Sequence, residues 1–429
     1  MQPLSFSVQP SDTAKAKEDY LSSREAAAIL EIKASTLYTY VSRGLIRATA
    51  QRGRKERMYL REDIEALKAR SQARNGHAAV AASALQWGQP VINSRITAIT
   101  PEGPRYRGHL ATVLAEQAAG FENVVELLWT GVLVHERFTW PIEPIPEHVG
   151  GLLTSLETDE HGLPKIMQAF SITTSALDLP VMEEMRRGAS ITLGHQILFV
   201  LAGCCGLLGP QRRFVAPTGR KSIAQHALEA IGGAVDEETV RAIDKALIIS
   251  ADHELGSATF VARIAASSGA SLQACIAAAL ATHSGTALAA GCDRIEDLVR
   301  GCDNVQQLKR VVQDVERSRG RLMSFDLQLY PNGDPRAQRL IELAKSRARQ
   351  PRRAELIYRL VEEIEQQLGM RANIEVGLVC LTAALELPDR SAAALWTLGR
   401  SAGWVAHVFE QRLAGYVLRP RAQFELGDT

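Results

Sequence analysis

Apolar residues near the start of the chain recur with the spacing of short amphipathic helices. Between Tyr20 and Leu30 they share one helical face behind Ser23, which we expect to cap the helix. A tight turn over 31–33 leads to a second predicted helix, with Ser35 as its N-cap and Gly44 at its end. The apolar residues of the two helices are Ala26, Ala27, Ile29, Leu30, Leu37, Tyr38 and Val41. This pattern predicts two helices joined by a short turn.

A basic loop follows these helices and precedes a short apolar segment. From Arg43 to Arg61 the sequence has seven basic residues and one acidic residue, Glu56. We expect Met58–Leu60 to form the strand of a wing and 61–70 to form a third helix. Residues 1–19 are expected to be a flexible N-terminus. Residues 71–90, rich in alanine and interrupted by glycines, are expected to be a linker.

In the remainder of the chain, 91–429, apolar and polar residues alternate over a short stretch and then follow the spacing of helices. Ile92, Ile96 and Ile99 predict short strands, with a turn over 101–104. Two stretches, 188–211 and 264–292, lack Asp, Glu, Lys and Arg over lengths that could span a bilayer. Because Gly, Ser, Gln and His interrupt both, we expect buried core helices and no membrane segment.

Composition indicates a globular and mostly helical fold. Hydrophobic residues make up 46% of the 429 residues and aromatic residues only 5%, while alanine, the best helix former, is abundant. The net charge of +1 excludes a field over the whole molecule that would attract nucleic acid or membranes. The first 75 residues differ, because five Lys and nine Arg against nine acidic residues give them a net charge of +5.

Cysteine spacing and the N-terminal sequence indicate the cellular compartment of the protein. The six cysteines show no C-x-x-C spacing, so they predict neither a disulfide framework nor a zinc site. The N-terminus lacks the apolar segment of a signal peptide. We therefore expect a cytoplasmic protein without a metal or a permanently bound cofactor.

The head, residues 20–70, resembles the winged helix-turn-helix of the MerR and excisionase type. The segments AAAILEIKASTLYTYVSRGLI and RMYLREDIEAL carry the resemblance. In such modules the second helix enters the major groove and wing cations contact phosphate. The implied DNA-binding residues are Thr36, Thr39, Tyr40 and Arg43 of the second helix, and Arg52, Arg54, Lys55 and Arg57 of the wing. The alternative is a docking or oligomerisation module with merely solvated arginines.

The body, residues 91–429, resembles the citrate synthase family. Four segments match that family in order and spacing: ADHELGSATFVARIAAS at 251–267, YPNGDPRA at 330–337, GRSAGWVAHVFEQ at 399–411 and LRPRA at 418–422. The resemblance implies a large helical domain and a small one, at about 275–380, in a homodimer or higher oligomer. It also implies acyltransferase chemistry of the tricarboxylic acid cycle, the condensation of acetyl-CoA or another acyl-CoA with oxaloacetate.

The resemblance assigns four substrate-binding residues. Arg336, Arg400 and Arg419 fall on the family's oxaloacetate-binding arginines, and His253 falls on its substrate-contacting histidine. Arginines suit a dicarboxylate because charge-assisted, bidentate hydrogen bonds replace its water. The alternatives are a core histidine for His253 and a surface cation for Arg419, whose family counterpart reaches into the neighbouring subunit's site.

The catalytic positions depart from the family. Leu288 stands where relatives have the histidine of GPLHGGA, and Leu327 where they have that of GFGHPLYPNGDPRA. Glu375 replaces the aspartate that acts as the base. Leucine can neither donate a hydrogen bond nor carry a proton, whereas glutamate can still accept one. A register shift of five residues would let His283 replace the first histidine, but the spacing from His253 favours Leu288.

The family's coenzyme A region falls between the two histidine motifs. The basic residues there are Arg294, Arg300, Lys309, Arg310, Arg317, Arg319 and Arg321. They fit a coenzyme A thioester as substrate and a solvated helix face equally well. The other histidines have no ligand spacing and are expected to be structural or on the surface: His77, His109, His135, His148, His161, His195, His226 and His407.

Three functions fit this sequence. The first is a pseudoenzyme-like subunit, weakly active or inactive alone, that acts with an intact paralogue. The second is a DNA-binding transcription regulator that responds to oxaloacetate or acyl-CoA. The third is an active citrate or 2-methylcitrate synthase. The two leucines at histidine positions favour the first two.

Overall fold

The computed structural model of the chain describes two parts. In the N-terminal part it describes residues 20–30, 32–33, 36–37, 40–41, 46, 48–50, 57–61, 64–65 and 68; beyond that it describes 92–142, 145, 147–154, 169–171, 174, 176–177, 190–285, 290–317, 322 and 324–419. Contacts divide the chain into one unit of residues 1–93 with 419–429 and a second unit of 94–418. The expected flexible N-terminus, 1–19, and linker, 71–90, lie outside the described residues.

The head has the strands and helices of a winged module. Its elements are β1 (Tyr20–Ser22), α2 (Ser23–Leu30), β2 (Ala48–Ala50) and β3 (Arg57–Leu60). The three strands form an antiparallel sheet in the order β1-β3-β2, so the basic loop joins the two strands of a wing, as predicted. The predicted third helix is confirmed at Arg61, Ile64 and Glu65. Six buried residues form the core: Leu21, Ala26, Leu37, Ile46, Tyr59 and Ile64.

Two expectations about the head are wrong. The helix α2 is capped by Ser22 rather than Ser23, because Glu25 N donates to Ser22 Oγ over 3.3 Å and Ser22 N donates to Glu25 Oε2 over 2.8 Å. Tyr40 and Thr36, both expected as exposed DNA readers, are partly buried, and Tyr40 packs against the core of the head. Its ring adds apolar area to the core of the head, which has only six buried residues among those described.

The body opens with a hairpin that matches the predicted strands. Its strands are β4 (Thr97–Thr100), β5 (Gly103–Tyr106) and β6 (His109–Leu110), paired antiparallel in that order. The fully buried Tyr106 hydroxyl lies 3.1 Å from the carbonyl oxygens of Ile248, Ile249 and Asp252. The hairpin is thereby fixed to the segment that carries the first of the four motifs.

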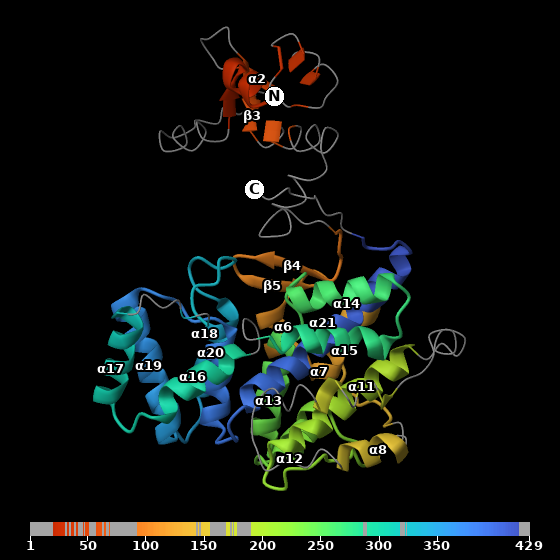
Figure 1. Ribbon diagram of the computed structural model, residues 1–429, viewed down its shortest axis with the longest axis vertical. Coiled ribbons are helices and arrows are strands. Elements are labelled where there is room, and N and C mark those ends of the chain that lie inside the picture. Colours follow the sequence, from red (N-terminus) through yellow and green to blue (C-terminus); the bar gives the residue numbers. More distant parts are fainter. Residues whose placement is uncertain are drawn as a thin grey trace, which may run out of the picture. The chain divides into compact units, whose positions relative to one another are not determined.

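Helices make up most of the body, as composition predicted (Figure 1). The first group comprises α6 (Ala111–Gln117), α7 (Phe121–Thr130), α8 (Glu147–Thr154), α11 (Ser190–Cys204), the 3₁₀ turn η1 (Cys205–Leu207), α12 (Ile223–Ile231), α13 (Glu237–Ser250), α14 (Ser257–Ser267), α15 (Leu272–His283) and α21 (Ser391–Ala414). The apolar stretch Ser190–Leu207 is long enough to cross a membrane, but 72% of it is buried inside the body. This confirms the prediction of a core helix.

A second group of helices gathers at one side of the body, at the left in Figure 1. It comprises α16 (Ala290–Arg300), α17 (Val305–Arg317), α18 (Pro335–Lys345), α19 (Arg352–Leu368) and α20 (Ile374–Ala384). Since α15 packs against α14 and α21 instead, this group begins at α16 rather than near residue 275. The two groups meet along α18, α20 and α21.

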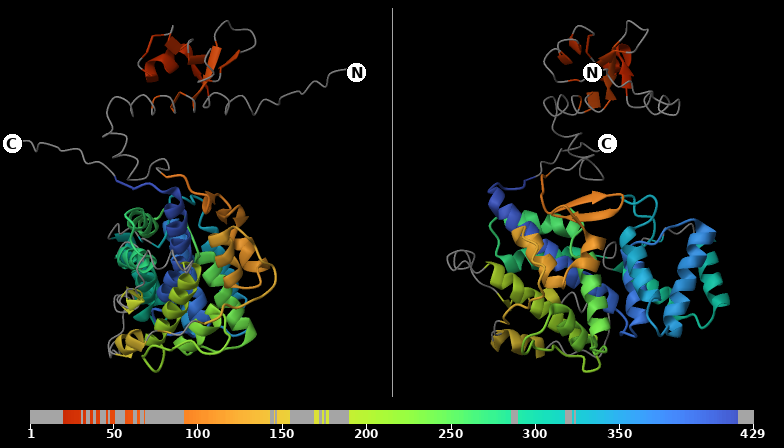
Figure 2. Two further views of the ribbon diagram at one scale, coloured as in Figure 1. Left: turned by 90° about the vertical axis from the view of Figure 1, so that its right-hand side faces the viewer. Right: turned by 180° about the vertical axis from the view of Figure 1, so that it is seen from behind.

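The long helix α21 passes closely against the end of α13 (Figure 2, blue). Two glycines one turn apart permit this approach. A Cβ at Gly403 would lie 2.4 Å from Ala251 O, and one at Gly399 would lie 2.8 Å from Ser250 Cβ. The glycines flank Arg400, so the same close contact brings the Arg400 guanidinium against Asp252.

Candidate active site

The start of α18 holds Arg336 in a fixed position. Asp334 is the N-cap of this helix, with Pro335 in the first turn, and its Oδ1 accepts the Arg336 backbone N–H over 3.0 Å. The guanidinium bonds the same carboxylate twice, Nε to Oδ1 over 2.9 Å and Nη2 to Oδ2 over 2.7 Å. Burial alone would lower the pKa of Arg336, but the Asp334 carboxylate outweighs it and raises that pKa. Arg336 therefore stays charged although it is 3% exposed.

A second buried arginine is held by Asp252. Arg400 Nη1 lies 3.1 Å from Asp252 Oδ1, and Arg400 Nη2 donates to Thr259 Oγ1 over 2.7 Å. His407 Nε2 lies 3.3 Å from the other oxygen of the same carboxylate. Burial would raise the pKa of Asp252, but His407 and Arg400 together lower it far below its usual range. The carboxylate is thus ionised and keeps the Arg400 side chain in one orientation.

His253 follows Asp252 and lies in the field of both arginines. Its Nε2 is 3.0 Å from the Tyr330 hydroxyl, which belongs to the motif preceding α18. Burial, and then the charges of Arg336 and Arg400, lower the pKa of His253 well below its usual value. The imidazole is therefore neutral near pH 7 and can hydrogen-bond an oxygen without adding charge.

The backbone after His253 is strained. Glu254 has a φ of 57°, a left-handed conformation that non-glycine residues rarely adopt. Its N–H donates to Asp252 Oδ2 over 3.2 Å, which helps to hold the turn. The next helix, α14, has Gly256 as its N-cap residue and therefore no side-chain cap. Such strain at a cluster of buried charges is typical of binding sites.

Glu375 lies in the first turn of α20, within the field of Arg336. Burial raises the pKa of Glu375 to about 7, although the Arg336 cation opposes the shift. Its side chain passes close to Gly291, where a Cβ would lie 3.0 Å from Glu375 Cγ and 2.9 Å from Ser324 Oγ. A carboxyl with this pKa can accept or release a proton near neutral pH, which is what a general base requires.

Leu327 occupies the edge of the same region. Its N–H donates to Asn373 Oδ1 over 3.0 Å, so the residue is placed beside the start of α20, and it is half-buried. The second replaced histidine position, Leu288, lies outside the described residues. The described part of the site therefore combines arginines that the motifs retain with an apolar side chain, Leu327, at a position where the motif of the resembled family has a histidine.

Three of the predicted substrate residues, His253, Arg336 and Arg400, share one electrostatic environment. Arg419 is exposed and belongs to the other unit of the chain, so its role stays a prediction. In the head, Thr36 is half-buried and helical and Arg57 lies in β3. The remaining predicted DNA contacts lie outside the described residues: Thr39, Arg43, Arg52, Arg54 and Lys55.

Sequence reasoning missed four residues of this network: Tyr106, Tyr330, Asp334 and His407. The expectation that His407 is a scattered structural histidine is incomplete, because it is fully buried and bonds both Asp252 and Arg263. Asp334 could have been found, since Asp-Pro is a recognised start of a helix. The partner of His407 could not, because it lies 155 residues away in sequence.

Three basic residues of the expected coenzyme A region form ion pairs with acids. Arg300 bonds Asp297 and Asp389, Lys309 bonds Glu363, and Arg317 bonds Asp314. Arg319 and Arg321 lie outside the described residues. These ion pairs are the arrangement of a solvated helix face, and a phosphate would have to compete with them.

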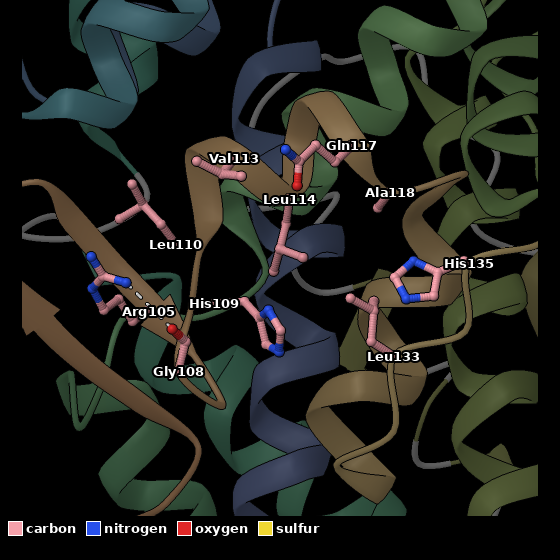
Figure 3. Close-up of a pocket in the computed structure, with 10 residues that line it drawn as sticks. All are labelled: Arg105, Gly108, His109, Leu110, Val113, Leu114, Gln117, Ala118, Leu133 and His135. Atoms are coloured by element: carbon pink, nitrogen blue, oxygen red, sulfur yellow. Dashed lines mark hydrogen bonds between the residues drawn. The ribbon is translucent and has the colours of Figure 1, made fainter.

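A separate cavity of about 330 Å³ lies between β5, β6, α6 and the segment after α7 (Figure 3). None of the predicted substrate residues lines it. Its side chains are mainly apolar, with Arg105, His109, Gln117 and His135 among them. The candidate site is instead the charged cluster at the end of α13, the starts of α18 and α20 and the middle of α21, where buried cations and perturbed pKa values occur together.

Comparison with known proteins identifies a family for each part of the chain. The family described as "Citrate synthase, C-terminal domain" matches residues 84–421. The chain belongs to the citrate synthase family. A second family, described as "Helix-turn-helix domain", matches residues 20–72. The body thus carries the citrate synthase match, and the head carries the helix-turn-helix match.

Relatives include synthases of two kinds. "Putative citrate synthase 2" of Mycobacterium tuberculosis (strain ATCC 25618 / H37Rv) is 29% identical over 336 residues, which cover 74% of this chain and 85% of that protein. "2-methylcitrate synthase 1" of Corynebacterium glutamicum is 24% identical over 352 residues, covering 77% and 91%. The relatives of this chain therefore carry the names of two different synthases.

Solved citrate synthase structures share the fold. That of Thermotoga maritima MSB8 has a TM-score of 0.66 at 20% identity, covering 80% of this chain and 95% of that chain. The ternary complex of the Thermoplasma acidophilum enzyme with carboxymethyl coenzyme A and oxaloacetate has a TM-score of 0.67 at 19% identity, covering 79% and 95%. These likenesses confirm the mostly helical citrate-synthase fold.

Proposed function

We propose that the body binds oxaloacetate, or a similar small dicarboxylate, between Arg336 and Arg400. The observation that carries this proposal is that two buried guanidinium groups are each oriented by a carboxylate, and that both lie close enough to His253 to lower its pKa. Preoriented arginines lose little side-chain entropy when they bind a carboxylate. The proposal is supported by the Thermoplasma acidophilum citrate synthase, a protein of the same fold whose ternary complex contains oxaloacetate.

Condensation with an acyl-CoA is proposed to be slow when this chain acts alone. Leu327 and Leu288 cannot donate the hydrogen bonds that stabilise the developing negative charge, and losing one positioned acid typically costs about 10²- to 10⁴-fold in rate. Glu375 remains as a base. Release of free thiol from acetyl-CoA or propionyl-CoA, in the presence of oxaloacetate, tests this. A rate within about tenfold of a citrate synthase with both histidines would contradict it.

The intact chemistry is proposed to come from a paralogue in a mixed oligomer, with this chain as its partner subunit in the cytoplasm. The test is a mixed dimer in which Arg419→Ala weakens the partner's oxaloacetate binding. Arg336→Ala, which acts only in this chain's own pocket, leaves the partner's activity unchanged. Equal effects of the two substitutions, or chains that do not co-purify, would remove the subunit role.

A regulator that binds DNA is the second candidate, and the winged arrangement of β2 and β3 favours it. We expect the full-length chain to shift duplex DNA and to bind less at higher salt, because wing cations release counterions from phosphate. Alanine at Arg52, Arg54 and Lys55 should weaken binding and flatten the salt dependence. The matched control removes three exposed cations of the body, Lys309, Arg349 and Arg359, and should leave binding unchanged.

A DNA titration with and without oxaloacetate tests whether a ligand bound to the body changes the DNA affinity of the head. A ligand changes DNA affinity only if it binds the DNA-free and DNA-bound states with different affinity. A regulator therefore predicts that saturating oxaloacetate shifts the DNA titration midpoint. An unchanged midpoint, in a chain that binds both ligands, would remove the regulatory role and leave DNA binding as a separate property.

A further inference from the structure

A buried histidine in the last turn of α15 has an unused ring nitrogen. His283 is 3% exposed, and its Nε2 has no hydrogen-bond partner among the described residues. The indole nitrogens of Trp396 and Trp404, which lie against it, also have none within that part of the chain. Buried polar groups are almost always paired, so a cluster of unpaired ones is costly and indicates a use.

The position of His283 follows from the spacing of residues on α21. Trp396, Arg400 and Trp404 are four residues apart, so they lie on one face of this helix. The His283 ring is 4.9 Å from the Trp396 ring and 5.4 Å from the Trp404 ring, edge to face with both. The imidazole therefore lies between the two indoles, opposite the turn that carries Arg400.

The charge of Arg400 reaches this imidazole. Burial first, and then the Arg400 cation, lower the pKa of His283 to about 3. The ring is consequently neutral near neutral pH. A neutral imidazole has one donor and one acceptor nitrogen and can bond an oxygen or a hydroxyl without opposing the nearby guanidinium.

Filling the space between two tryptophans does not require a histidine. Leucine or methionine would pack between the indoles without a buried nitrogen that lacks a partner. A purely structural role thus predicts that an apolar residue at position 283 is tolerated or stabilising. A ligand-binding role predicts a loss of affinity, since the unused nitrogen is then the group that the ligand contacts.

We propose that His283 is a substrate-binding residue, whose Nε2 hydrogen-bonds an oxygen of the dicarboxylate that Arg400 holds. This inference rests on the proposed function of the body. It assigns to α15 a neutral hydrogen-bonding group in a site where Leu327 offers none. The contribution is to binding and orientation of the ligand and needs no proton transfer.

The experiment compares two variants of the full-length chain. Oxaloacetate affinity is measured by titration calorimetry, and the urea midpoint is measured without ligand. His283→Leu is expected to weaken oxaloacetate binding about 10- to 100-fold, as loss of one hydrogen bond to a charged group does, while its urea midpoint stays equal or rises. His283→Gln, which keeps a hydrogen-bonding nitrogen at a similar reach, is expected to bind within about threefold of the unaltered chain.

A matched control replaces another buried histidine. His226 lies in α12 beside Phe199, and His226→Leu should leave oxaloacetate affinity unchanged. Unchanged affinity in His283→Leu, with binding by the unaltered chain intact, would overturn the inference while the proposed function stands. Failure of the unaltered chain to bind oxaloacetate would overturn both. If the leucine variant does not fold, His283→Met takes its place with the same two outcomes.

Discussion

Glu375 couples the chemistry of the site to the stability of the fold. Its carboxyl is carried by the first turn of α20, and burial raises its pKa to about 7 from the usual 4.5. This difference corresponds to about 3 kcal/mol between the protonated and ionised forms. Replacement by glutamine keeps the shape and the hydrogen-bonding capacity of the protonated acid but removes its ionisation.

The sign of the effect follows from linkage. Because the folded pKa is raised, the folded chain retains the proton that the unfolded chain loses, and stability decreases as pH rises from 4.5 to 7. Glu375→Gln should therefore stabilise the chain by about 1 kcal/mol at pH 5 and about 3 kcal/mol at pH 8. Urea unfolding at the two pH values measures the difference.

The same variant should lose condensation, because the amide cannot accept a proton. Residual thiol release by the unaltered chain should increase with pH around a midpoint near 7, where Glu375 ionises. The control is Glu296→Gln in α16, since burial raises the pKa of Glu296 to about 7 as well. It should show the same pH-dependent stabilisation without changing the rate. A gain in stability that is equal at pH 5 and pH 8 would refute the reasoning.

Three further variants test how the site is built. Leu288→His combined with Leu327→His should raise the rate of thiol release, and no increase would mean that other parts of the pocket have also changed. Asp334→Ala leaves Arg336 buried without its partner and should lower the free energy of unfolding by about 3–5 kcal/mol, measured by urea. Gly291→Ala places a methyl group against Glu375. It should reduce the residual rate of thiol release and change the thermal midpoint little.

Local sequence signals predicted the elements that depend on neighbouring residues. The β4 and β5 hairpin, the wing of the head and the buried helix α11 all appear where alternation, turn residues and uncharged stretches placed them. Family motifs supplied Arg336, Arg400 and His253, which the structure brings into one charged cluster. These predictions were correct because each depends on residues that are close together in the sequence.

Contact between distant segments explains the missed role of His407, whereas the misplaced cap of α2 and the missed Asp334 involve neighbouring residues. His407 bonds Asp252 only because Gly399 and Gly403 let α21 touch the end of α13. Tyr40 is drawn into the head's core because so small a module has few apolar residues to bury. No spacing near His407 indicates its contact with Asp252, whereas Tyr40 follows Leu37 by three residues and shares its helical face.

Titration calorimetry measures the binding of oxaloacetate to the unaltered chain and to an Arg400→Lys variant, and it thereby tests for a dicarboxylate site at the buried arginines. Lysine keeps the charge but cannot bond Asp252 and Thr259 with one planar group. We predict saturable binding to the unaltered chain and binding at least about tenfold weaker in the variant. Absence of binding, or equal affinity in both proteins, would contradict a dicarboxylate site between the buried arginines.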